Sequence, residues 1–195
     1  LLCFYIMQFK RKIFFIERVY KMDLNEPTKN SNTIFSGRII NLRIDDVVLP
    51  NGKVAKREIV EHGGGVSILA INKDGKIIMV KQYRKPAEKV LLEIPAGKLD
   101  IGEKPDECAK RELMEETGYI AKELKHLFSF YPSPGFSTEV LHLYLADDLE
   151  KGTPHTDADE FLDVYEYSVD EIKEMIKNGL IEDAKTLIAL LYYIK

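Results

Sequence analysis

The chain has 195 residues, of which 45% are hydrophobic and 31% charged, and its formal net charge is −4. This length suffices for one well-buried domain with a small appended subdomain. The negative charge argues against a nucleic-acid backbone as the main partner, but not against a single nucleotide, whose charge a bound cation can neutralise. Two cysteines, Cys3 and Cys108, are too few and too far apart for a disulfide framework, so we expect a cytoplasmic protein.

The first 21 residues differ from the rest of the chain. The apolar run from Leu1 to Phe9 is too short to span a bilayer, and basic residues follow it, whereas a signal peptide has them first. We therefore expect residues 1–21 to be a non-native or disordered extension upstream of a natural start at Met22. An anchor lying in the membrane interface is the alternative.

Strand patterns begin after Thr33. Residues 34–49 and 53–62 alternate between apolar and polar types around a Pro-Asn-Gly turn, which predicts a hairpin or small antiparallel sheet. We predict an N-terminal β subdomain over 22–62 and the main domain over 63–195. Within the main domain, a hairpin of 66–72 and 76–82 is expected to precede a strand over 90–94.

A helix is predicted from Pro105 to Thr117, because most of these residues favour helices, proline suits the first turn and Gly118 suits the left-handed stop. Glu112, Glu115 and Glu116 then share one helix face. Like charges at this spacing repel each other, so a cation should lie against them, and carboxylate oxygens are the hard ligands that Mg²⁺ or Mn²⁺ prefers. A solvated acidic surface is the alternative.

The rest of the chain predicts further strands and two helices. Strands are expected over 121–131, 139–146 and 161–167. Ser168 with Glu171 forms a capping box that predicts a helix to Asn178, and an amphipathic pattern predicts a last helix over 183–194. Strands around one acidic helix and a terminal helical unit indicate an α+β fold.

The segment from Gly97 to Tyr119, GKLDIGEKPDECAKRELMEETGY, resembles the Nudix box. The positions that match its spacing are Gly97, Glu103, Arg111, Glu112, Glu115, Glu116 and Gly118. The resemblance implies a Nudix-type α/β/α sandwich of mixed sheet and metal-dependent hydrolysis of a nucleoside diphosphate linked to another group. It further implies two or three Mg²⁺ ions, with Mn²⁺ as the alternative, held by the Ala96 carbonyl, Glu112, Glu115 and Glu116. Glu115 and Arg111 are expected to take part in catalysis, Arg111 by bracing a neighbouring carboxylate.

Three further segments resemble the ADP-ribose pyrophosphatase branch of that family. They are Gln82-Tyr83-Arg84, Leu92-Glu93-Ile94-Pro95-Ala96-Gly97 and Tyr131-Pro132-Ser133-Pro134-Gly135-Phe136. This resemblance implies that Arg84, Pro134, Gly135 and Glu139 contact the substrate. It also implies a homodimer in which the N-terminal sheet lends Phe35, Arg57 and Glu58 to the adenine pocket. Ordinary surface roles are the alternative for the charged members of both sets.

A general base has to come from elsewhere, because carboxylates that hold a metal are poor proton acceptors. The acidic stretch from His155 to Glu160 corresponds to the loop that supplies this base in relatives. We expect Glu160 to be the base, with Asp159 and Asp157 as the next candidates. The alternative is an acidic loop that only tunes metal affinity.

The predicted activity is the hydrolysis of ADP-ribose to AMP and ribose 5-phosphate. A pyrophosphatase for another nucleoside-diphosphate sugar such as GDP-mannose is the alternative within the same class. A non-catalytic ADP-ribose sensor is less consistent with the complete box, and the roughly thirty residues after Tyr167 are too few for an added DNA-binding module. No nucleic-acid or membrane partner is expected.

Overall fold

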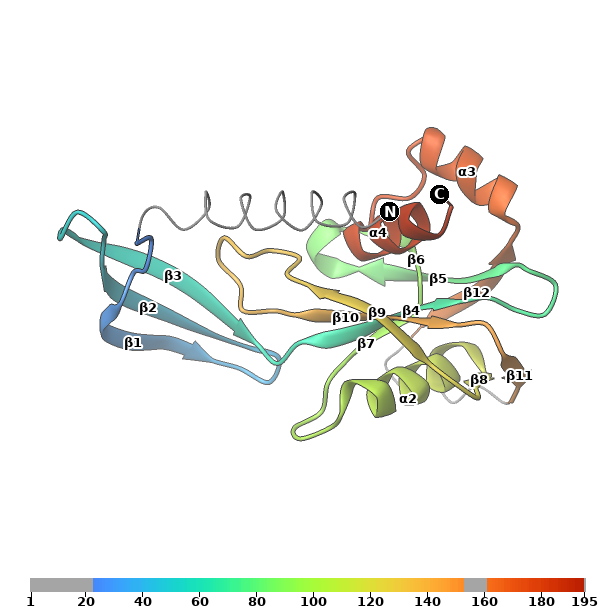
Figure 1. Ribbon diagram of the computed structural model, residues 1–195, viewed down its shortest axis with the longest axis horizontal. Coiled ribbons are helices and arrows are strands. Elements are labelled where there is room, and N and C mark those ends of the chain that lie inside the picture. Colours follow the sequence, from blue (N-terminus) through green and yellow to red (C-terminus); the bar gives the residue numbers. More distant parts are fainter. Residues whose placement is uncertain (1–22, 153–160, 195) are drawn as a thin grey trace, which may run out of the picture. The chain divides into compact units, whose positions relative to one another are not determined.

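The computed structural model describes residues 23–152 and 161–194 (Figure 1). The predictions for residues 1–21 and for Asp157, Asp159 and Glu160 therefore fall outside the described residues. The described chain divides into two compact units. One contains the residues up to Gly37 together with 41–60, and the other contains 38–40 and the residues from Glu61 onward.

The first unit is a three-stranded sheet of β1 (Thr28–Ser36), β2 (Ile40–Val48) and β3 (Val54–His62), in that order. The prediction of one strand over 34–49 was wrong, because the chain turns back between Ser36 and Ile40 and pairs β1 with β2 in antiparallel fashion. The turn contains Gly37. A glycine indicates a turn, but the alternating apolar pattern continues on both sides of Gly37 and therefore looks like a single strand.

The second unit contains a mixed sheet with the strand order β7-β4-β10-β9. Its strands are β4 (Gly65–Ala70), β7 (Ala96–Lys98), β9 (Lys125–Phe130) and β10 (Leu141–Ala146). The β4–β10 pair is parallel, whereas β4–β7 and β10–β9 are antiparallel. Strand β4 is buried along its whole length, as expected for a strand covered on both faces.

A three-stranded antiparallel sheet with the order β12-β5-β6 completes the strand layer. It contains β5 (Ile77–Arg84), β6 (Lys89–Glu93) and β12 (Leu162–Tyr167), with the 3₁₀ turn η1 (Lys85–Ala87) between β5 and β6. The predicted hairpin pairing of 66–72 with 76–82 was wrong beyond a single bridge between Ile71 and Ile77. Both edges of β4 are already occupied by β7 and β10, so β5 pairs elsewhere.

Three helices occur in the described part of the chain: α2 (Pro105–Thr117), α3 (Val169–Lys177) and α4 (Ala184–Tyr193). The predicted signals for their ends are confirmed, with Gly118 in the left-handed region at φ 71° and a complete capping box between Ser168 and Glu171. The predicted strand over 121–131 is interrupted and forms β8 (Tyr119–Ala121), which pairs with β11 (Leu149–Lys151), and then β9.

Helices cover both faces of the strand layer in the second unit (Figure 1). Ile68 of β4 belongs to the cluster with Leu113 of α2, while its neighbour Leu69 belongs to the cluster with Leu190 of α4. This alternation produces two hydrophobic cores, one on each face. The α/β/α sandwich predicted from the sequence is therefore confirmed. Among the described residues, no helix has the length and hydrophobicity that crossing a bilayer requires.

Candidate active site

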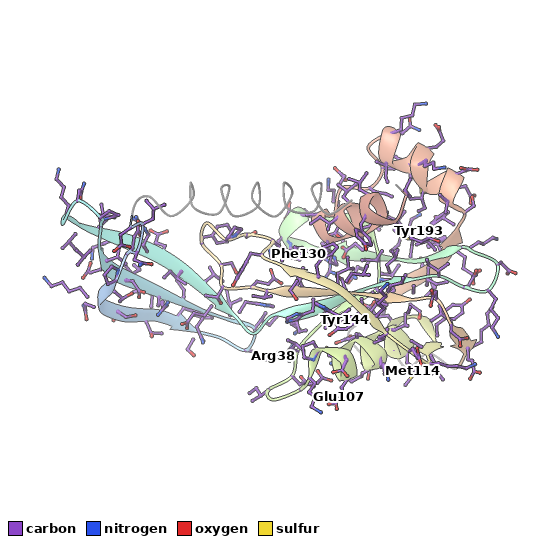
Figure 2. All side chains as sticks on the ribbon, viewed as in Figure 1. Arg38, Glu107, Met114, Phe130, Tyr144 and Tyr193 are labelled. Atoms are coloured by element: carbon purple, nitrogen blue, oxygen red, sulfur yellow. The ribbon has the colours of Figure 1, made fainter. Side chains whose placement is uncertain are left out.

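The acidic helix α2 lies on the sheet with one apolar side and one charged side. Cys108, Ala109 and Leu113 face the core, and Figure 2 shows Tyr144 of β10 between the sheet and α2. Glu107 lies on the side away from the sheet and is exposed. Since the apolar side is fixed against the sheet, the carboxylates at positions 112, 115 and 116 have a fixed orientation toward β7 and the loop before the helix.

Arg111 is the centre of the charged side. Its Nη1 donates to Oε1 of Glu112 and to Oε2 of Glu115, both at 2.9 Å. Its Nε and Nη2 donate to the two carboxylate oxygens of Glu103, also at 2.9 Å. These hydrogen bonds from Arg111 hold the pKa of Glu103 at about 2. The bracing role predicted for Arg111 is thus compatible with its contacts, and Glu103 is a partner to which the sequence analysis gave no role.

Gly97 provides the space in which the Glu112 carboxylate lies. A Cβ atom at position 97 would be 1.8 Å from the carboxyl carbon of Glu112 and 2.0 Å from its Oε1. Only glycine permits this approach of a side chain to the backbone of β7. The glycine of the box is therefore explained by the position of Glu112, which is 9% exposed.

Glu116 is attached to the same strand by a different contact. Its Oε2 accepts a hydrogen bond of 3.1 Å from the backbone N–H of Ala96, and the residue is 4% exposed. The predicted metal-binding carbonyl of Ala96 therefore belongs to a residue that Glu116 contacts directly. The strand end at β7 and the helix α2 meet at this point.

The donor set suits a hard divalent cation. In the described part of the chain, no group of three or more His, Cys, Asp or Glu side chains is arranged as a metal-binding cluster, and Arg111 forms hydrogen bonds with both Glu112 and Glu115. The guanidinium shows that these two carboxylates meet at a cationic group. Carboxylate and carbonyl oxygens at such a point are the ligands of Mg²⁺ or Mn²⁺, and Gly97 leaves room for Glu112 to reach it.

Arg84, predicted to contact substrate, lies at the end of β5 and binds Glu93 of β6. Its Nε donates to Oε1 of Glu93 at 2.8 Å and its Nη2 to Oε2 at 2.7 Å. Burial opposes ionisation of Glu93, but hydrogen bonds from Arg84 and the charge of Lys185 outweigh it and lower the pKa. The Arg84 side chain is 40% exposed, so part of it faces solvent. The negative charge of Glu116 contributes, after the hydrogen bonds and charge of Glu93, to the raised pKa of Arg84.

The predicted substrate loop is a turn between β9 and β10. The carbonyl of Ser133 accepts hydrogen bonds from the N–H groups of Phe136 and Ser137, and this closes the turn around exposed Pro134 and Gly135. Glu139 follows the turn, and its Oε1 lies 3.7 Å from Nδ1 of His62. The structure thus brings the loop residues together, but on a different sheet from Arg84.

The three predicted adenine-pocket residues lie on the N-terminal sheet. Phe35 on β1 is 54% exposed. Arg57 on β3 forms a bidentate pair with Glu26, at 2.7 and 2.6 Å, rather than with its neighbour Glu58. Adjacent strand residues point to opposite faces, so Arg57 and Glu58 do not share a face of this sheet.

Two buried residues near the site were missed in the sequence analysis. Glu93 lies in the Leu92–Gly97 segment and Lys185 in the amphipathic helix expected over 183–194, but the sequence pattern predicts no role in the site for either of them. The available signal was that Lys185 is the only charged residue of α4. A single charge in the first turn of an apolar helix indicates a buried partner.

The chain is similar to several known proteins. Residues 61–190 match the model of the NUDIX domain, and residues 26–60 match the nucleoside diphosphate sugar hydrolase N-terminal domain. An ADP-ribose pyrophosphatase from Bacillus subtilis (strain 168) is 48% identical over 87% of this chain and 92% of its own length. A methanol dehydrogenase activator from Bacillus methanolicus is 51% identical over 86% and 91%. A crystal structure described as an ADP compounds hydrolase has the same fold, with a TM-score of 0.77 at 23% identity over 88% of this chain and 92% of that one.

The family match and the relatives identify the chain as a hydrolase that acts on phosphoric anhydride bonds. The chain belongs to the Nudix family, since the family model covers most of it and close relatives match nearly its whole length.

Proposed function

We propose that this protein hydrolyses the diphosphate of ADP-ribose to AMP and ribose 5-phosphate. The observation that carries the proposal is that Glu112 and Glu115 both accept hydrogen bonds from the Arg111 guanidinium, so the two carboxylates meet at one cation. Glu116, on the same helix, accepts a hydrogen bond from the N–H of Ala96. The choice of a nucleoside-diphosphate sugar is supported by the match of residues 26–60 to the N-terminal domain of such hydrolases. ADP-ribose is supported by the relative of that activity at 48% identity.

Glu112, Glu115, Glu116 and the Ala96 carbonyl would hold the cation, which we propose to be Mg²⁺ in two or three sites, with Mn²⁺ as the alternative. When bound, it neutralises charge on the diphosphate oxygens and lowers the pKa of the attacking water. In the structure Arg111 forms hydrogen bonds with Glu112, Glu115 and Glu103; with the cation bound, it would keep its two hydrogen bonds to Glu103 and brace the neighbouring carboxylates from that side. Arg84 presents its exposed edge to the diphosphate, and Pro134, Gly135 and Glu139 contact the sugar-phosphate half.

We also propose a cytoplasmic homodimer in which the N-terminal sheet reaches the partner subunit. Among the described residues of the N-terminal unit, Val47 is the only buried apolar residue, whereas Ile34, Phe35 and Val54 are all more than half exposed. A sheet with so little core of its own needs another surface to cover it. Phe35, Arg57 and Glu58 would then be supplied to the adenine pocket.

The test is a substrate panel with Mg²⁺: ADP-ribose, GDP-mannose, NADH, diadenosine polyphosphates and 8-oxo-dGTP, with products separated by chromatography. We expect the highest kcat/KM with ADP-ribose and the appearance of AMP. A higher value for GDP-mannose would identify the other nucleotide-sugar activity. Tight binding of ADP-ribose without turnover would identify a sensor.

The Glu116→Gln variant tests the metal site within the same panel. The fold should persist, because a glutamine oxygen can still accept the N–H of Ala96. We expect kcat to fall at least about 10²-fold, since one charged ligand oxygen is lost. Near-normal Mg²⁺-dependent turnover would refute the assignment of Glu116.

We propose Glu160 as the general base, ahead of Asp159 and Asp157. Glu160→Gln should lower kcat while KM and the Mg²⁺ requirement stay nearly unchanged, because the group acts in the transition state more than in binding. Steady-state kinetics over a range of Mg²⁺ concentrations measure all three quantities. If the variant instead needs more Mg²⁺ for half-maximal activity, Glu160 is a metal ligand and Asp159 becomes the candidate base.

A further inference from the structure

A buried ionic network connects the C-terminal helix to the active site. Glu93, which is fully buried at the end of β6, accepts hydrogen bonds from Arg84 and from Nζ of Lys185. Nζ of Lys185 also lies 3.0 Å from Oδ2 of Asp183, and the Lys185 side chain is only 10% exposed. Two cationic and two anionic side chains thus share this site, and one of them, Arg84, extends to solvent.

The same turn of α4 also holds the backbone next to Glu93. The N–H of Ile94 donates to Oγ1 of Thr186 at 2.9 Å, and the Thr186 hydroxyl donates to Asp183 at 2.6 Å. Asp183 is in turn the N-cap of α4. Both the side chain of Glu93 and the backbone that follows it are therefore fixed by the first turn of the C-terminal helix.

Lys185 sets the charge that Arg84 experiences. With Lys185 in place, the charges of Glu93 and Asp183 are matched by Arg84 and Lys185. Without it, Arg84 would be the only cation among the described residues facing both carboxylates, and the charge of Glu116 acts on Arg84 as well. Interactions between charges are strong in a partly buried site. The carboxylates would therefore neutralise more of the positive charge of Arg84, and less of it would act on a bound anion. In the part of the chain that the structure describes, Nη1 of Arg84 makes no hydrogen bond, which leaves it available to an anion.

We propose that Lys185 is a positioning residue for the substrate diphosphate: it fixes Glu93, and Glu93 holds the partly exposed guanidinium of Arg84 in the orientation that meets the bound anion. The inference rests on the proposed function, which assigns Arg84 to substrate. It extends that function to a residue of α4 that does not touch the substrate. It also gives the C-terminal helix a role in substrate affinity beyond packing.

The test compares Lys185→Met with Lys89→Met. Lys89 makes a comparable 2.7 Å contact with Glu182 and joins β6 to the segment before α4, but both side chains are about half exposed. Binding of ADP-ribose is measured by calorimetry in EDTA, where metal-dependent turnover cannot occur, and kinetics are measured at saturating Mg²⁺. We expect Lys185→Met to raise Kd and KM about tenfold while kcat changes less than about threefold. Lys185→Arg should restore most of the affinity, and Lys89→Met should behave as wild type.

Inorganic pyrophosphate, which has the diphosphate without nucleoside or sugar, is the second probe. Its affinity should fall with Lys185→Met in the same proportion, whichever nucleotide sugar the enzyme hydrolyses. If the wild-type protein does not hydrolyse ADP-ribose but Lys185→Met still weakens pyrophosphate binding, the proposed substrate is refuted and the proposed role of Lys185 is retained. Wild-type protein that does not bind pyrophosphate, or a Lys185→Met variant with unchanged affinity, would overturn the inference.

A double-mutant cycle with Arg84→Gln separates positioning from general stability. If Lys185 acts through Arg84, the Kd of the double variant should exceed that of Arg84→Gln by less than about twofold. If the increases in Kd caused by the two substitutions multiply in the double variant, the residues act independently and the proposal is contradicted. A Lys185→Met variant with a lower melting temperature but unchanged Kd would also contradict it. Should Lys185→Met not fold, Lys185→Gln is measured in the same cycle with the same expectations.

Discussion

Gly97 shows how one residue controls the position of a carboxylate that we propose as a metal ligand. A methyl group at position 97 would overlap the carboxylate of Glu112, whose atoms are the nearest to it. We expect Gly97→Ala to displace that carboxylate and to lower kcat at least about 10²-fold, as loss of a metal ligand would. The free energy of unfolding should fall by only ~1 kcal/mol, because the displaced atoms are the end of a flexible side chain. Activity assays and chemical denaturation measure the two effects.

Gly63→Ala is the matched control for this prediction. A Cβ atom at position 63 would have only the carbonyl oxygen of Leu99 nearby, at 4.0 Å, so kinetics close to wild type are expected. Wild-type activity in Gly97→Ala would mean that the observed place of Glu112 is not needed for catalysis.

At the residue scale, the sequence could predict the side chains that one helix brings together. Glu112, Glu115 and Glu116 share a face because of their spacing, and this follows from helix geometry alone. The contact between Glu93 and Lys185 joins positions 92 residues apart and depends on how α4 packs on β6. Spacing along the chain carries no information on such a contact.

At the scale of elements, patterns predicted helices better than strand pairing. The boundaries of α2 and α3 follow from a proline, a glycine and a capping box, all of which act within one turn. Strand β4 was placed correctly, but its partner was not. Pairing is decided by which edges remain open in the whole sheet, and short strands such as β7 and β11 have too few residues to show a period.

Tyr119 connects elements that the sequence could not place next to each other. Its hydroxyl donates to Oε1 of Glu166 at 2.6 Å, and Asn72 donates to the other oxygen at 2.8 Å, so β8, β12 and the turn after β4 meet at one carboxylate. We expect Tyr119→Phe to lower the free energy of unfolding by about 1–2 kcal/mol, because a hydrogen bond to a charged group is lost. Urea denaturation measures the loss, and Tyr83→Phe, at a residue that is 55% exposed, is the control.

The same hydrogen bond predicts a dependence on alkaline pH. Burial and the hydrogen bond to Glu166 raise the pKa of Tyr119 to about 12, whereas the unfolded chain releases this proton near pH 10. A raised pKa stabilises the folded protein below pH 10, and this contribution is lost as the pH rises toward 12. The difference in unfolding free energy between wild type and Tyr119→Phe should therefore shrink between pH 10 and 12. A constant difference over this range would contradict the assigned contact.

At the scale of the whole molecule, the hydrophobic residues are divided unequally between the two units. Both buried clusters consist of residues between Val66 and Ile194. The N-terminal sheet instead has a buried carboxylate, Asp45, which accepts hydrogen bonds from Thr28 and Ser31. This distribution could be predicted only in part from the sequence, because alternating strands in both units look alike until their partners are known. It predicts that the second unit can fold without the N-terminal sheet, whose proposed role is in substrate recognition.

A protein that starts at Glu61 tests this division. It keeps both hydrophobic clusters and the tie between the backbone N–H of His62 and Thr138, so we expect a cooperative thermal transition by circular dichroism. It lacks Phe35, Arg57 and Glu58, so KM for ADP-ribose should rise at least about tenfold, and sedimentation velocity should show a monomer. Pyrophosphate affinity serves as the internal control and should stay within about twofold of wild type, because Arg84, Glu93 and Lys185 are all retained. A shortened protein that fails to fold would show that the sheet stabilises the catalytic unit. One that keeps full affinity for ADP-ribose would remove the N-terminal unit from substrate recognition.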